Sequence, residues 1–349
     1  MRYSKSFPAV VSAVLLLALP AARAAAAQEA AAEPLQVVAT LPVLADLVRE
    51  VGGPRVSVQS LSDPRQDPHY VQPTPLLMKR ARDADAFVEV GLQLELWAQK
   101  VVESSGNPQI QQGQPGRIVA SSGIPTLEVP EQVSRDWGHV HPYGNPHLWL
   151  DPLLAADMAA NVAEGLIDLD PAHAEGYRAR LKDFQDRVDR ALFGEALVQR
   201  VGGSKLGRLA KQGRLLEYLE RKELADQLGG WLGRAAPLRG RPIVTYHKTW
   251  VYFADRFGFQ VPIEIEDKPG IPPSARHRDR VLELVGEVGV RTLLVAGFYD
   301  RTAADYLAER SGARVVALPI DVGSAVRAPD YFALIDRLVE ELVSSETGS

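Results

Sequence analysis

Residues 35–60 read LQVVATLPVLADLVREVGGPRVSVQS, and this stretch decides the fold class. Two runs rich in β-branched residues, 35–40 and 55–60, are typical of strands, and the residues between them, 43–52, have helical spacing. Strand, helix and strand in this order form the βαβ unit of a parallel sheet that is covered by helices.

The same alternation continues on both sides of the middle of the chain. Pro75 fits the first turn of a helix because its φ angle is fixed, and residues 86–90 and 117–120 are further predicted strands. Later in the chain we predict three strands and a final helix, at 241–246, 291–296, 314–318 and 329–344. The sequence therefore predicts an α/β protein with two lobes, each a mostly parallel sheet flanked by helices.

One long helix is predicted between the lobes. Asp170-Pro171 has the sequence of a helix start, with Asp as N-cap and Pro in the first turn. Apolar residues then recur every three or four positions, at Tyr177, Leu181, Phe184, Val188 and Leu192. We expect an N-terminal lobe at 28–168, a linking helix at 169–193, a glycine-rich insertion at 194–240 whose role the sequence does not indicate, and a C-terminal lobe at 241–349.

The first 27 residues are interpreted as a secretory signal peptide that is removed. Arg2 and Lys5 precede an apolar stretch at 8–19, and Ala22-Arg23-Ala24 is a small-residue cleavage site. The chain contains no cysteine, so we expect neither disulfides nor an acylated N-terminal cysteine. These features predict a periplasmic protein that is soluble and not lipid-anchored.

Composition excludes some classes of partner. The chain has 39 basic and 44 acidic residues, and without the three basic residues of the signal its net charge is −8. A mildly acidic protein is a poor candidate for binding nucleic acid or anionic lipid.

Three histidines stand in short segments with unusual sequences. His69 lies in DPHYVQPTP, His147 lies in NPHLWLDP, and His247 ends the run PIVTYH. Asp321 follows another apolar run, RVVALPI, and the four residues are 78, 100 and 74 positions apart. Because loops at the carboxyl ends of parallel strands meet at one edge of a sheet, we expect the fold to bring these side chains together.

Three imidazoles and one carboxylate form a closed tetrahedral shell for a divalent cation such as Zn²⁺. A single histidine is more often structural, but four such groups at strand-to-loop positions favour a metal site. Asp300 is a nearby competitor for the position of Asp321.

These motifs, in this order along nearly the whole chain, resemble those of the metal solute-binding proteins of zinc and manganese ABC importers (cluster A-I). The resemblance implies two α/β lobes, a rigid linking helix and one metal in the cleft, with His69, His147, His247 and Asp321 as ligands. It also implies a protein that captures Zn²⁺ and delivers it to a membrane permease. A periplasmic metallochaperone is a possible second partner, and we expect a monomer.

The ligand set favours zinc over manganese. In the family, two His with two carboxylates resemble a manganese site, whereas His at position 247 makes this set zinc-like. A manganese- or iron-binding member remains the alternative. Many zinc members also carry a His-rich loop before the second ligand. Here only His139 and His141 are present, and the sequence leaves open whether they capture metal or are simply solvated.

Two alternative functions would require other features. A secreted zinc hydrolase needs an open coordination position and a general base, for which Glu264 and Glu266 are candidates. However, residues 263–266 alternate like a strand with one solvated face, and neither His-Glu-x-x-His nor Gly-x-Ser-x-Gly is present. A purely structural metal site is the other alternative, and it differs in unfolding when the metal is chelated. We therefore predict a protein that is not an enzyme.

Overall fold

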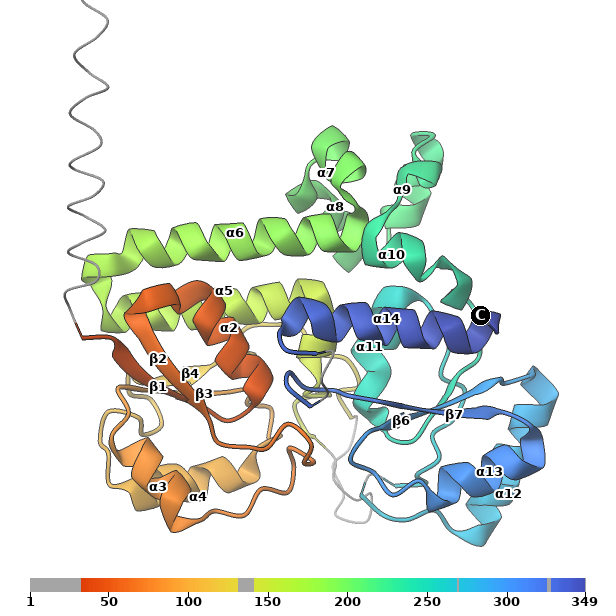
Figure 1. Cartoon of the computed structure of the whole chain (residues 1–349), viewed down its shortest axis with the longest axis horizontal. Coiled ribbons are helices and arrows are strands. Elements are labelled where there is room, and N and C mark those ends of the chain that lie inside the picture. Colours follow the sequence, from red (N-terminus) through yellow and green to blue (C-terminus); the bar gives the residue numbers. More distant parts are fainter. Residues whose placement is uncertain (1–32, 131–140, 269, 325–327, 349) are drawn as a thin grey trace, which may run out of the picture.

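The computed structural model describes residues 33–130, 141–268, 270–324 and 328–348. The predicted signal peptide and His139 lie outside these ranges. Two α/β lobes stand side by side, and a long helix runs over the N-terminal lobe and ends near the inner edge of the C-terminal lobe (Figure 1).

The N-terminal lobe contains a parallel four-stranded sheet with the order β2-β1-β3-β4. Its strands are β1 (Leu35–Ala39), β2 (Val56–Ser60), β3 (Ala86–Glu89) and β4 (Arg117–Val119). Its helices are α2 (Pro42–Gly52), α3 (Pro75–Arg82), α4 (Leu96–Ser105) and α5 (Pro152–Leu169). Helices α2 and α5 lie on one face of the sheet, whereas α3 and α4 lie on the other (Figure 1). The predicted βαβ start of the fold is confirmed.

The C-terminal lobe contains a parallel three-stranded sheet with the order β5-β6-β7. The strands are β5 (Val244–Thr245), β6 (Thr292–Ala296) and β7 (Arg314–Leu318), and the helices are α11 (Val251–Phe257), α12 (Ala275–Val288), α13 (Thr302–Ser311) and α14 (Tyr331–Thr347). Strand β5 is shorter than predicted. Pro242, which has no N–H to donate, forms only an isolated bridge with Gln260.

The linking helix α6 (Ala174–Phe193) starts later than the sequence indicates. Residues Pro171–His173 form a 3₁₀ turn, and the Asp170 side chain does not cap it. Instead Asp170 accepts hydrogen bonds from His173 Nδ1 (2.7 Å), from the Tyr177 hydroxyl (2.9 Å) and from the Arg55 guanidinium. The predicted N-cap is thus wrong, and Asp170 anchors the helix to the N-terminal lobe.

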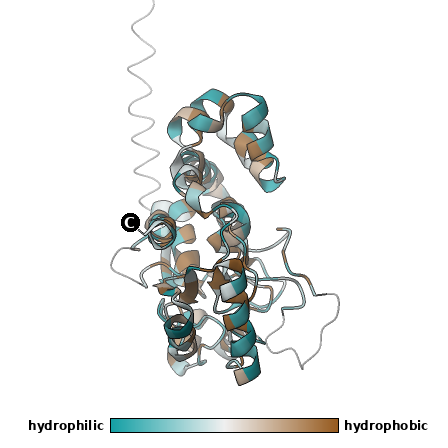
Figure 2. Ribbon diagram, turned by 90° about the vertical axis from the view of Figure 1, so that its right-hand side faces the viewer, coloured by the Kyte–Doolittle hydropathy of each residue, from teal (hydrophilic) through white to brown (hydrophobic). Residues whose placement is uncertain are grey.

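Residues 194–240 form a set of short helices, and the first three of them project away from the two lobes (Figures 1 and 2). These are α7 (Glu195–Val201), α8 (Gly203–Lys211), α9 (Leu215–Arg221) and α10 (Gly230–Arg234). Leu215, Leu219 and Leu224 are buried, as their spacing predicts. The indole of Trp231 in α10 donates to Asp336 of α14 at 2.8 Å, which ties the end of this segment to the C-terminal lobe.

A continuous apolar core joins the lobes. One cluster of buried side chains includes Val37 of β1, Phe184 of α6, Leu294 of β6 and Tyr331 of α14. Because such a core is close-packed, relative motion of the lobes must be small or must disrupt it.

Candidate metal centre

The fold brings together the three histidines that the sequence singled out. His69 lies between β2 and α3, His147 precedes the 3₁₀ turn Leu148–Leu150, and His247 lies two residues after the end of β5. Each of the three histidines offers one ring nitrogen as a potential ligand, and these three nitrogens all lie within 4.8 Å of one another. The ring centroids are 5.5 Å apart for His69 and His147, 5.9 Å for His69 and His247, and 6.0 Å for His147 and His247.

Each ring is oriented through its Nδ1 atom. His69 Nδ1 lies 2.7 Å from Asp67 Oδ1, and His247 Nδ1 lies 2.9 Å from Glu266 Oε2. His147 Nδ1 lies 2.9 Å from Asn145 Oδ1. With Nδ1 bonded to an acceptor oxygen, Nε2 is the atom that each imidazole presents to the space between the rings.

The electrostatics favour a neutral imidazole at His147. Burial lowers the pKa of His147 well below its usual value, and the neighbouring histidines lower it further. Burial alone would raise the pKa of Asp67, but hydrogen bonding to His69 outweighs it, and the pKa of Asp67 is lowered. A neutral imidazole binds a cation without first releasing a proton.

A fourth histidine lies beside His69, although among the described residues the group whose ligand atoms all lie within 4.8 Å of one another contains only His69, His147 and His247. His141 Nε2 is 3.2 Å from His69 Nε2, and His141 Nδ1 is 3.2 Å from the carbonyl oxygen of Leu92. Two nitrogens bound to one tetrahedral Zn²⁺ at about 2.0–2.1 Å stand roughly 3.3 Å apart, so this separation suits two ligands of one ion.

Asp321 is placed differently. Within the described residues it is not a member of the histidine cluster, and its Oδ1 accepts from the backbone N–H groups of Val43 (2.7 Å) and Val322 (2.8 Å). Burial raises its pKa well above the usual value, although these two hydrogen bonds oppose the shift. Asp300, the alternative, is exposed and accepts from Thr302 at the start of α13. The assignment of Asp321 as a ligand thus stays a prediction.

Sequence reasoning missed the groups behind the imidazoles. The alternating pattern predicts Glu266 on a solvated face, but its side chain is buried, at 8% exposure, and faces His247. The expectation is wrong because residues 264–266 run beside β5: the N–H groups of Ile265 and Glu266 donate to Thr245 and Tyr246. Asp67, two residues before His69, was the one accessible signal, because Asx side chains bond to backbone and side chains two residues later.

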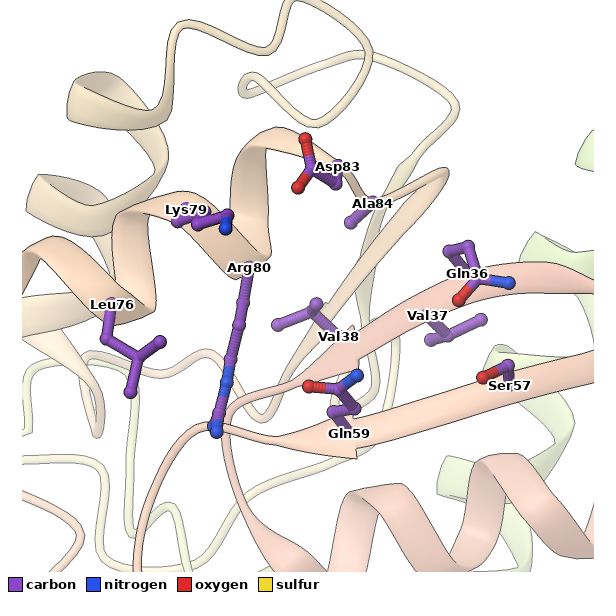
Figure 3. A pocket seen from close by; sticks show the side chains of 10 residues that line it. All are labelled: Gln36, Val37, Val38, Ser57, Gln59, Leu76, Lys79, Arg80, Asp83 and Ala84. Carbon is purple, nitrogen blue, oxygen red and sulfur yellow. The ribbon is translucent and has the colours of Figure 1, made fainter.

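The groove in Figure 3 is not part of this centre. It has a volume of about 270 Å³ and lies between α3 and strands β1 and β2. Arg80 extends along it and donates to the carbonyl oxygen of Ser60. It contains none of the predicted ligands.

None of the helices in the described part of the chain combines the length and apolar composition needed to cross a membrane.

Comparison with known proteins gives a consistent result. The family model described as zinc-uptake complex component A, periplasmic, matches residues 37–192 and 221–345, which leaves helices α7 and α8 and most of α9 outside the match. The iron-binding protein YfeA of Yersinia pestis is 25% identical over 318 residues, which cover 89% of this chain and 86% of that protein. The manganese ABC transporter substrate-binding lipoprotein PsaA of Streptococcus anginosus is 27% identical over 179 residues, and the match spans only 50% of this chain and 55% of the relative.

Solved structures share the fold. The crystal structure of ZnuA has a TM-score of 0.65 with 20% identity, and the match covers 90% of this chain and all of that one. The cadmium-bound periplasmic metal-binding protein of Candidatus Liberibacter asiaticus has a TM-score of 0.64 with 18% identity, over 89% of this chain and 99% of the other. At this identity the likeness shows the fold alone. From the family match, the chain belongs to the zinc-uptake complex component A family of metal-binding ABC transporter substrate-binding proteins.

Proposed function

We propose that this protein captures Zn²⁺ in the periplasm and delivers it to the membrane permease of an ABC importer. The observation that carries the proposal is the convergence of His69, His147 and His247 from three separate loops. Each imidazole already has a hydrogen-bond partner at Nδ1, so the fold does not require the three rings to lie together. Binding of one cation by three nitrogens explains why they do.

Zinc is proposed over manganese because of the donor atoms. Three nitrogen ligands suit a borderline-soft cation that accepts four-coordination, whereas Mn²⁺ prefers oxygen donors. Relatives that carry iron or manganese in their names make these metals the alternative cargo. The three histidines support zinc, but the ligand that completes the shell also matters.

Two residues are candidates for the fourth ligand. Asp321, predicted from the sequence, accepts from the N–H groups of Val43 and Val322 through Oδ1, so its other oxygen, Oδ2, is the atom that would bind the cation. His141 already stands beside His69 with its Nε2 toward that ring. We keep Asp321 as a predicted ligand and propose His141 as its competitor, and a test for the choice between them is given in the Discussion.

The proposed carrier role also fits the shared core of the lobes. A carrier must load and release its cargo, and small shifts of loops achieve this without a wide hinge. The histidine ligand atoms lie up to 4.8 Å apart, whereas ligands of one tetrahedral Zn²⁺ stand roughly 3.3 Å apart. Loading should therefore bring these ligand atoms closer to one another by up to about 1.5 Å. The same proposal includes delivery of the metal to a permease and a metallochaperone as a second partner. It also includes a monomeric state and secretion directed by residues 1–27.

The test is metal analysis of protein purified without a metal-affinity tag. We expect one equivalent of zinc per chain, held against competition by a zinc chelator, and weaker binding of Mn²⁺ and Fe²⁺. X-ray absorption should report nitrogen-dominated coordination. A shell of six oxygens would refute zinc as the cargo, and zinc-dependent ester or peptide hydrolysis would favour the hydrolase alternative.

A further inference from the structure

Two of the three imidazoles are backed by carboxylates, and the third is backed by an amide. Asp67 and Glu266 accept from His69 and His247, whereas Asn145 accepts from His147. The amide is not interchangeable with a carboxylate here. Asn145 Nδ2 donates to Glu128 Oε2 (3.0 Å) and to the carbonyl oxygen of Lys248 (2.7 Å), so its oxygen is fixed toward the imidazole.

Both carboxylates are well buried. The side chain of Glu266 is 6% exposed and that of Asp67 is 15% exposed. Glu266 Oε2 also accepts from the N–H of Gly270 (3.0 Å), and Asp67 Oδ1 also accepts from the N–H of His69 (2.9 Å). Each carboxylate is thus held in place by a second hydrogen bond, independent of any ion.

The charges match those of a divalent cation. Three neutral imidazoles leave the charge of +2 uncompensated, and burial makes uncompensated charge costly. Two carboxylates directly behind the imidazoles supply −2. Accordingly, if the zinc site proposed above is correct, we propose that Asp67 and Glu266 are positioning residues that orient His69 and His247 and balance the charge of the bound cation through them.

The choice of cargo follows from this arrangement. Negative charge placed behind nitrogen ligands allows the cation to be neutralised without oxygen atoms in direct contact with it. The arrangement therefore retains a nitrogen-rich shell, which Zn²⁺ accepts and Mn²⁺ does not favour. It also leaves Asp321 able to stay bonded to Val43 while metal is bound.

The experiment removes each charge and keeps the hydrogen-bond acceptor. Asp67→Asn and Glu266→Gln should each weaken Zn²⁺ binding by about 10–100-fold in chelator competition, with one equivalent still bound. The matched control is Asp170→Asn, which alters the same kind of carboxylate–histidine pair, with His173 at 2.7 Å, near the start of the linking helix. The control should leave Zn²⁺ affinity unchanged.

A second measurement distinguishes loss of the carboxylate charge from distortion of the metal site. Coulomb energy is proportional to the charge of the ion, so the loss measured with Ag⁺ should be about the square root of the loss measured with Zn²⁺. The absorption spectrum of Co²⁺-loaded Glu266→Gln should keep the parent's tetrahedral bands, whereas Glu266→Ala should alter them. Equal losses for Ag⁺ and Zn²⁺, or Zn²⁺ affinities within twofold of the parent, would overturn the charge-balance role. If the parent protein itself binds no zinc, the proposed function fails. That outcome differs from one in which the parent binds zinc but the carboxylate variants do not behave as expected.

Discussion

The carboxylate of Asp321 accepts a 2.7 Å hydrogen bond from the backbone N–H of Val43, which lies 278 residues earlier in the chain and in the other lobe. Val43 is in the first turn of α2, whose own N-cap residue provides no side-chain hydrogen bond. Asp321 therefore caps a helix across the lobe interface, where a carboxylate also interacts favourably with the helix dipole. The opposite contact is present as well: Asp46 Oδ2, within α2, accepts from the N–H of Tyr331 at the start of α14 (2.8 Å).

Replacement of Asp321 should separate its two suggested roles. Asp321→Ala leaves the N–H groups of Val43 and Val322 without their acceptor and should cost about 1–3 kcal/mol for each buried group that water cannot reach. Asp321→Asn keeps an acceptor oxygen and should cost much less. Urea unfolding of the metal-free proteins measures the difference.

The same variants should keep metal binding through the three histidines. Hydrogen exchange on metal-free and zinc-loaded protein then reports the loops. If Asp321 is a ligand, protection gained by residues 319–324 on zinc binding should vanish in Asp321→Ala. If that loop gains protection in the variant as fully as in the parent, Asp321 is an interface cap and not a ligand.

The sequence predicts the fold more completely than the site. The βαβ alternation and the helical spacing require only local patterns, so the two lobes, their parallel sheets and the linking helix were predictable. The three histidines were predictable as well, because each follows or precedes a strand-like or turn segment whose ends meet in a parallel α/β fold. The position of Asp321 was not, because a carboxylate just after a strand serves equally as a ligand or as a helix cap.

Glu266 shows why the remaining parts of the site could not be predicted. Its segment alternates like a half-exposed strand, but a bridge between Thr245 and Glu264 places it beside β5, where Glu266 faces inward. Register between segments that are distant in sequence depends on the assembled sheet, which single-sequence patterns do not encode. The same limit applies to His141, whose position depends on contact with the loop at Leu92.

The buried carboxylate of Asp46 should make stability depend on pH. Burial raises its pKa from 3.8 to about 6, despite the opposing hydrogen bond from Tyr331. An acid whose pKa is higher in the folded state is stabilising at low pH, and that contribution is lost as pH rises from about 4 to about 6. The full loss is on the order of 2–3 kcal/mol. Asp46→Asn still offers an acceptor to Tyr331 but does not titrate, so its stability relative to the parent should increase between pH 4.5 and pH 7.5.

Urea unfolding of both proteins in the presence of a chelator measures this change. Asp63→Asn is the control, because Asp63 is exposed and its pKa is lowered, chiefly by the Arg65 side chain. The control should show almost no change over this range, because a lowered pKa places the titration of Asp63 below pH 4. A stability difference between Asp46→Asn and the parent that is constant over this pH range would contradict the assignment.

Metal removal should leave the protein folded. The continuous core through both lobes does not depend on the histidine cluster, so chelation should preserve the far-UV circular dichroism and reduce the melting temperature only by the lost binding energy. At a free zinc concentration of 100 times Kd, that energy is about 2.7 kcal/mol. Adding zinc back should restore the original melting temperature. Unfolding on chelation would instead indicate a structural metal site.

The last prediction concerns the fourth ligand. His69→Ala, His147→Ala and His247→Ala should each weaken zinc binding by at least 100-fold, because loss of one imidazole from a buried shell of few ligands must be compensated by water. His173→Ala is the control, since His173 bonds to Asp170 near the linking helix and its loss should not affect zinc binding.

His141 and Asp321 are then compared with each other through Co²⁺ spectra and X-ray absorption of the zinc-loaded variants. If His141 completes the shell, His141→Ala should replace one nitrogen by oxygen and shift the Co²⁺ bands, whereas Asp321→Asn should leave both unchanged. The position of His141 Nε2, 3.2 Å from that of His69, favours this outcome. The reverse pattern would establish Asp321 as the ligand, with Oδ2 bound to the metal and Oδ1 still able to accept from Val43.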